Sequence, residues 1–104
     1  MFKLNPDPTF HATVDIPKHG GGVLPLKLEF KHRTTDELDE FIKAESTLKM
    51  DNVDLVMAFA VGWADVDAPF SAEAVATLCK NYKAAPFAIR DKYLEEITQA
   101  RLGN

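Results

Sequence analysis

Apolar and polar residues alternate along two segments near the start of the chain. Every second residue is apolar from 10 to 16, and the same alternation returns from 24 to 30. A period of two is typical of a strand that buries one face. Three consecutive glycines at 20–22 lie between the segments and can adopt the positive φ angles of a chain reversal. The pattern therefore predicts a β-hairpin over residues 9–32.

The predicted hairpin presents one apolar face. Its members are Phe10, Ala12, Val14, Ile16, Leu24, Leu26, Leu28 and Phe30. Two strands are marginally stable in water by themselves, so this face needs a cover of helices or of another subunit. Leu26 and Leu28 are accordingly candidates for protein binding, and a homo-oligomer is one way to cover them.

Prolines mark two further features of this region. Pro25 lacks a backbone N–H, which predicts that the second strand is an edge of the sheet at that point. Pro6 and Pro8 fix their φ angles and remove two backbone donors. We therefore expect residues 1–8 to form an extended arm that leads into the hairpin.

From residue 34 onward, the apolar residues recur at intervals of three and four, which is the period of amphipathic helices. Capping or first-turn residues mark four helix starts, at Thr34, Asp51, Ser71 and Pro86. The second helix is expected to include residues 53–61, a loop is expected at 62–69, and the last helix is expected to continue to Gly103.

These elements predict an α+β protein in which an N-terminal β-hairpin is followed by a bundle of about four α-helices. The chain of 104 residues has the size of one domain, 1–104, with its helical part at 34–104. Hydrophobic residues make up 46% and charged residues 27%, which is the composition of a globular protein.

Charge and composition exclude several classes of partner. A formal net charge of −4 argues against a surface that neutralises many phosphates, so we expect no nucleic-acid binding. The longest nearly uncharged stretch, residues 55–64, is about half the length of a membrane-spanning helix. Cys79 is the only cysteine, and the start of the chain lacks the pattern of a signal peptide. We therefore expect a protein of the reducing cytoplasm without a membrane partner.

No pattern of residues indicates catalysis. His11, His19 and His32 lack a second ligand at the spacing of a zinc site. Cys79 falls on the apolar face of its predicted helix, where an inert buried thiol is the simpler interpretation. The glycines at 20–22 lack the lysine and hydroxyl of a phosphate-binding loop. The sequence therefore predicts no catalytic residue, no metal and no cofactor.

One segment stands out as a candidate for protein binding. Trp63, the only tryptophan, and Phe70 flank the acids Asp65 and Asp67 directly before a predicted helix. Tryptophan is favoured as an anchor in protein interfaces. The alternative is that both aromatic side chains simply pack the ends of two helices into the core.

The middle of the chain is acidic. Residues 34–73 contain ten acidic and only two basic side chains, a net charge of −8. Acidic residues in the first turns of helices, together with a solvated helix face, account for part of this excess. The other interpretation is an electrostatic docking surface for a basic partner.

Several features occur together in an order that resembles the small tail assembly chaperones of long-tailed bacteriophages and prophages. They are the opening at 3–10, the end of the hairpin at 30–34, the Gly62-Trp63 segment with its acids and Phe70-Ser71, the stretch 81–89 and the ending 98–104. The resemblance extends over nearly the whole chain.

The resemblance implies a non-enzymatic accessory protein that acts in the bacterial host cytoplasm. Such a chaperone coats the long tape measure protein, recruits tail tube subunits and is displaced as the tail is completed. The alternative is a minor structural tail protein or a head-completion protein that stays in the finished virion.

Overall fold

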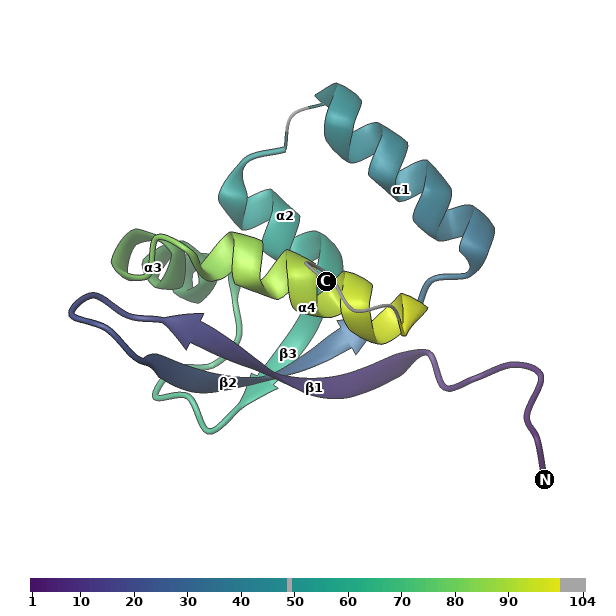
Figure 1. Cartoon of the computed structure of the whole chain (residues 1–104), viewed down its shortest axis with the longest axis horizontal. Helices are drawn as coiled ribbons and strands as arrows, with labels where there is room; N and C mark the ends of the chain where they lie inside the picture. Colours follow the sequence, from purple (N-terminus) through teal and green to yellow (C-terminus); the bar gives the residue numbers. More distant parts are fainter. Residues whose placement is uncertain (49, 100–104) are drawn as a thin grey trace.

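Figure 1 shows the computed structural model, in which a three-stranded sheet is covered on one side by helices. The structure describes residues 1–48 and 50–99, without the side chains of 45–48. Its elements are β1 (Thr9–Pro17), β2 (Val23–Lys31), α1 (Thr35–Leu48), α2 (Asn52–Phe59), β3 (Ala60–Ala64), α3 (Ala72–Asn81) and α4 (Ala85–Thr98). The predicted α+β class, the N-terminal hairpin and the four helices are confirmed.

The hairpin has a continuous antiparallel register. Thr9 pairs with Lys31 at one end and Pro17 with Val23 at the other, without a bulge between them. Gly20, Gly21 and Gly22 have φ angles of 85°, 100° and 80°, a region that residues with a Cβ rarely adopt. The three glycines thus permit the chain reversal that the sequence predicts.

The predicted loop at 62–69 is wrong at its start, because residues 60–64 form a third strand. α2 ends at Phe59, and the chain then extends along β2, pairing Trp63 with Leu28 and Ala60 with Phe30. Ala60 and residue 61 therefore belong to β3 and not to the predicted second helix. Five residues directly after a helix are too few to show a period of two, so only pairing with β2 identifies this strand.

β2 is the central strand of the sheet, yet Pro25 lies at an edge as predicted. The pairing of β3 with β2 stops at Lys27, which pairs with Ala64. Pro25 lies beyond that point and pairs only with Asp15 of β1. The missing N–H of this proline therefore disturbs no ladder.

The predicted helix starts are confirmed by their caps. The Thr34 hydroxyl accepts from the Glu37 N–H at 3.2 Å, and the Glu37 carboxylate accepts from the Thr34 N–H at 2.9 Å. The hydrogen bond from the Thr34 N–H to the Glu37 carboxylate lowers the pKa of Glu37, and the Thr34 side chain adds to the effect. Asp51 and Ser71 cap α2 and α3. Pro86 lies in the first turn of α4, which ends at Thr98; the predicted end at Gly103 lies outside the described residues.

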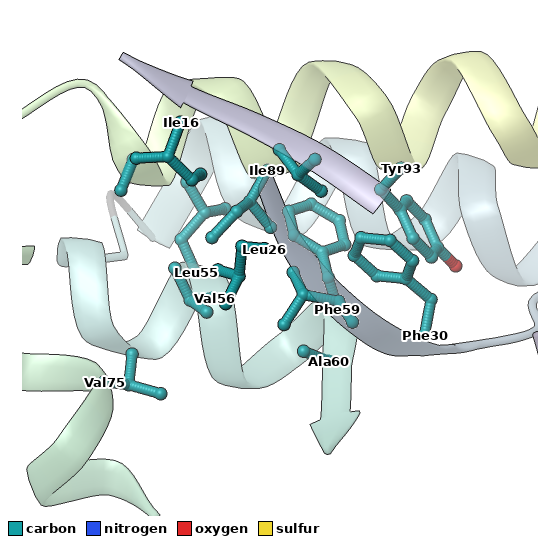
Figure 2. Packing of buried hydrophobic residues seen from close by; sticks show 13 residues of the cluster. Ile16, Leu26, Phe30, Leu55, Val56, Phe59, Ala60, Val75, Ile89 and Tyr93 are labelled. Carbon is teal, nitrogen blue, oxygen red and sulfur yellow. The ribbon is translucent and has the colours of Figure 1, made fainter. Parts of the chain in front are cut away.

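The core lies between the sheet and the helices. The hairpin contributes the buried side chains Val14, Ile16, Leu26, Leu28 and Phe30, and the helices contribute Leu55, Val56, Phe59, Val75, Ala85, Ile89 and Tyr93. Figure 2 shows the aromatic rings at one end of this layer and the aliphatic side chains Ile16, Leu26 and Leu55 at the other. Leu24, predicted on the same face, is an exception: it is 42% exposed.

Tyr93 joins segments that are far apart in the sequence. Its ring centroid lies 4.5 Å from that of Phe59 and 5.4 Å from that of Phe30. Its hydroxyl donates to the Lys31 carbonyl at 2.9 Å and accepts from Arg33 at 3.1 Å. Buried polar groups need such partners, and both are supplied by the residues at the end of β2.

Arg33 extends this network to α1. Its guanidinium also donates to the Ala58 carbonyl at 2.7 Å and lies 4.3 Å from the centre of the Phe41 ring. Phe41 in turn meets the Phe59 ring edge to face, with centroids 5.1 Å apart. The start of α1 is therefore attached by one cation–π contact and one aromatic pair.

The Tyr93→Phe variant tests the hydroxyl. Removing it leaves the Lys31 carbonyl and one Arg33 N–H without their partner, and we expect a loss of about 1–3 kcal/mol in the free energy of unfolding. Urea denaturation measures the change. Phe87→Leu, at a side chain that is 59% exposed, is the control and should change stability by less than about 0.5 kcal/mol.

The effect of Tyr93→Phe on the free energy of unfolding should depend on pH. Burial raises the pKa of Tyr93, so the unfolded chain ionises this phenol at lower pH than the folded chain does. The stability that the neutral phenol contributes is complete below about pH 10, the usual tyrosine value, and is lost as the pH rises. The difference in unfolding free energy between wild type and Tyr93→Phe should therefore be smaller at pH 11 than at pH 8. The same stability difference between the two proteins at both pH values would contradict this prediction.

Candidate functional site

A groove of about 620 Å³ lies between the turn end of the hairpin, the segment after β3 and α3. Its lining is mostly apolar and comprises Ile16, Leu24, Pro25, Leu26, Trp63, Asp65, Val66, Asp67, Ala68, Ala74, Thr77, Leu78, Asn81 and Tyr82. Four of the six predicted binding residues are thus brought together, namely Leu26, Trp63, Asp65 and Asp67. The groove falls within the size range of small ligand sites, about 300–1,000 Å³.

Trp63 forms one wall of the groove and also holds the segment that follows. The indole N–H donates to the Ala68 carbonyl at 2.8 Å. Its ring meets Phe70 edge to face, with centroids 5.2 Å apart and an interplanar angle of 89°. Phe70 therefore supports Trp63 from behind and does not itself line the groove.

Asp65 turns the chain at the end of β3. Its φ of 57° is in the left-handed region, where aspartate is among the better tolerated residues. Its carboxylate lies 2.6 Å from the Lys27 ammonium. The hydrogen bond and the opposite charge lower the pKa of Asp65 and raise the pKa of Lys27. The charge of Asp65 is therefore paired, whereas Asp67 projects as an exposed carboxylate on the same rim.

The other wall comes from α3. Ala74, Leu78 and Tyr82 lie at intervals of four and face the hairpin residues across the groove. Opposite them, Leu24 continues the apolar face of β2 beyond the buried Leu26. An apolar groove with carboxylates at its rim suits an apolar side chain followed by a cationic or hydrogen-bond-donating group.

Comparison with known families identifies the chain. A family model described as phage tail assembly chaperone matches residues 1–104, the whole chain. The chain belongs to the phage tail assembly chaperone family. Comparisons with curated proteins and with solved structures give no significant match.

Two of the six predicted binding residues, Leu26 and Leu28, lie in the core of this chaperone. Leu28 is 1% exposed and Leu26 is 9% exposed, and the helices cover both. Only the edge of Leu26 reaches the groove. Their part in protein binding stays a prediction, but in the folded chain their first role is to hold the sheet against the helices.

The groove also contains residues that the sequence did not single out. Leu78 and Tyr82 come from α3 and its C-cap, and Leu24 belongs to the apolar face of the hairpin that the sequence predicts to be covered. All three have side chains that line the groove, and Leu24 is substantially exposed. One sequence signal could have indicated the exposure of Leu24. The apolar alternation of the hairpin continues up to the turn, where the short predicted helices need not cover it.

The acidic excess of residues 34–73 is distributed over several structural roles. Glu37 closes the capping box of α1, Asp51 caps α2, and Asp54 and Glu73 lie in first turns. Such positions are favoured by the helix dipole. The docking interpretation then depends on the rim of the groove; the side chains of 45–49 lie outside the described residues.

The described residues show neither a metal-binding cluster nor an activated thiol. Among them, no cluster of three or more His, Cys, Asp or Glu side chains could hold a metal ion. Burial raises the pKa of the Cys79 thiol, with a further contribution from Asp51, which disfavours the reactive thiolate. No helix within residues 1–48 and 50–99 is long and apolar enough to cross a membrane.

The Trp63→Phe variant tests how the wall of the groove is held. Phenylalanine can keep the edge contact with Phe70, but it cannot donate to the Ala68 carbonyl. We expect a loss of about 1 kcal/mol in the free energy of unfolding, the usual value of one hydrogen bond. Urea denaturation measures this loss, and amide exchange should become faster at residues 65–68. Equal stability and exchange in the two proteins would show that the bond contributes nothing.

Proposed function

We propose that this chaperone binds the tape measure protein during tail assembly, in the cytoplasm of the bacterial host and without catalysis. Membership of the tail assembly chaperone family supports the general role. The observation that carries the proposal is the groove, where Trp63 and the apolar side chains of β2 and α3 line one open hollow. Tail tube subunits are a second partner that the same role suggests.

An apolar groove of this kind matches the chemical problem of the partner. A long helical protein exposes apolar stripes before the tube encloses it, and such stripes aggregate unless they are covered. Helices commonly bind by placing apolar side chains in a hydrophobic groove of the partner. The Asp67 carboxylate at the rim would favour a segment with a lysine or arginine beside its apolar anchor.

A chaperone must also be released. One groove of this size contacts only a few side chains, so each copy binds with moderate affinity. Many copies bound along one long partner nevertheless keep it covered through their combined contacts. Each copy can still dissociate individually as the tube grows. A shallow groove is therefore better suited to this role than a deep pocket.

Binding is tested with a purified tape measure protein. We expect Leu78→Asp to weaken binding by at least about tenfold, or 1.4 kcal/mol, because it places a charge in the groove. Phe87→Asp is the matched control: Phe87 is also apolar, is 59% exposed and lies outside the groove. Trp63 is the only tryptophan, so its fluorescence reports occupation of the groove directly when the partner segment lacks tryptophan.

Equal binding by folded Leu78→Asp and Phe87→Asp would remove the groove from the proposal. Circular dichroism must first show that both variants keep the helical content of the wild type. A change in the Trp63 emission without loss of binding in Leu78→Asp would place the partner near, but not in, the groove.

The composition of finished particles separates an assembly factor from a structural protein. A chaperone that is displaced as the tail is completed should be absent from purified virions, although it is present in infected cells. Quantitative mass spectrometry of both samples makes the comparison. A fixed number of copies in every particle would instead favour a minor tail or head-completion protein.

A further inference from the structure

β1 is the free edge of the sheet, and its outward backbone groups can be identified. The His32 N–H donates to the Pro8 carbonyl at 2.9 Å, in register with the pairing of Thr9 and Lys31. Successive residues of an antiparallel strand direct their backbone groups to opposite sides. Even-numbered residues of β1 therefore bond to β2, and the N–H and C=O groups of Thr9, His11, Thr13 and Asp15 point away from the sheet.

This edge lacks the usual protection against pairing. Edge strands are commonly blocked by lysines, prolines, bulges or a covering segment. β1 pairs with β2 over nine residues without a bulge, and its only proline, Pro17, is its last residue. Within residues 1–48 and 50–99, no hydrogen bond from another element reaches the outward backbone groups of Thr9, His11, Thr13 or Asp15. β3, at the opposite edge, is shorter and has five residues.

The residues of β1 are complementary to a second copy of the same strand. If Thr13 faces Thr13 of the second copy, His11 faces Asp15 of the second copy on the outer face, so an imidazole N–H can donate to a carboxylate. On the inner face, the same register places Phe10 beside Ile16 and Ala12 beside Val14. A shift of two residues in either direction shortens the overlap and separates His11 from Asp15.

The ends of the strand support the same register. The arm before β1 carries Phe2 and Leu4, which are 86% and 87% exposed, and the far end of the hairpin carries Val23 and Leu24, at 50% and 42%. Figure 1 shows the arm and the hairpin turn at opposite ends of β1. Antiparallel pairing directs the arm of each copy toward the hairpin turn of the other, so that these exposed apolar groups come close together.

We propose that β1 pairs with β1 of a second copy, antiparallel and centred on Thr13, to form a two-fold symmetric dimer. The two sheets then form one six-stranded sheet with all helices on the same face. The contact is the same on both subunits, so it closes on itself. It borders the groove at Ile16 and Leu24, but it is argued from the β1 edge and does not depend on the proposed binding of the tape measure protein.

The test compares Thr13→Pro with Thr13→Ala. Proline is tolerated at an edge position whose N–H points to solvent, but it cannot donate to the second copy. Alanine removes the side chain and keeps the N–H. Sedimentation equilibrium should give a mass of twice 11.6 kDa for wild type and Thr13→Ala. Thr13→Pro loses two hydrogen bonds per dimer, and its dissociation constant should rise about thirtyfold.

Amide hydrogen exchange of the wild type gives a second measurement that needs no substitution. At concentrations where the dimer forms, the amides of His11, Thr13 and Asp15 should be protected, as those of Val14 and Ile16 are by β2. Diluting the protein should remove protection only from the odd-numbered group.

Three results would overturn the proposal. The first is a wild type that stays monomeric at millimolar concentration. The second is rapid exchange at His11, Thr13 and Asp15 in a dimer whose even-numbered amides are protected. The third is equal association by Thr13→Pro and Thr13→Ala, which would show that the backbone of this edge is not in the interface. If Thr13→Pro fails to fold, the exchange measurement decides alone.

Discussion

Burial of the Tyr93 side chain with both of its polar partners satisfied is the constraint on which the rest of the structure depends. α4 can pack on the hairpin only where the Tyr93 hydroxyl reaches the Lys31 carbonyl and Arg33. That position fixes the ring against Phe10, Phe30 and Phe59. Tyr93 is thereby the residue at which four elements meet, namely β1, β2, α2 and α4. Arg33 then reaches over Phe41 and attaches α1 to this cluster.

This packing explains why the groove lies where it does. The aromatic cluster is at the Lys31 end of β2, where Tyr93 of α4 packs on Phe30 (Figure 2). At the opposite end, near the hairpin turn, the apolar face of β2 continues past the buried Leu26 to Leu24, which is 42% exposed. Trp63 and α3 enclose this uncovered part from two sides. The groove is thus the part of the hairpin face that the core does not use.

Charge serves mainly local structure in the described part of the chain. Acidic side chains cap helices or occupy first turns, and Asp65 is paired with Lys27. Arg33 is the one cation drawn into the aromatic cluster, where its guanidinium satisfies the tyrosine hydroxyl and a backbone carbonyl. The apolar groove and the free β1 edge are left as the distinctive surfaces.

Patterns that repeat within a few residues were determined by the sequence itself. The alternation from 10 to 30, the glycines of the turn, the capping box at Thr34 and the caps at Asp51 and Ser71 depend on neighbouring residues, and all of them appear in the structure. The tertiary structure alone decided the features that need a distant partner. Residues 60–64 became a strand because β2 offered a free edge, and Leu24 stayed 42% exposed beside the groove. The groove likewise brings Trp63 together with Leu78 and Tyr82. Which side chains meet across it depends on how distant elements pack, and a local sequence period does not contain that information.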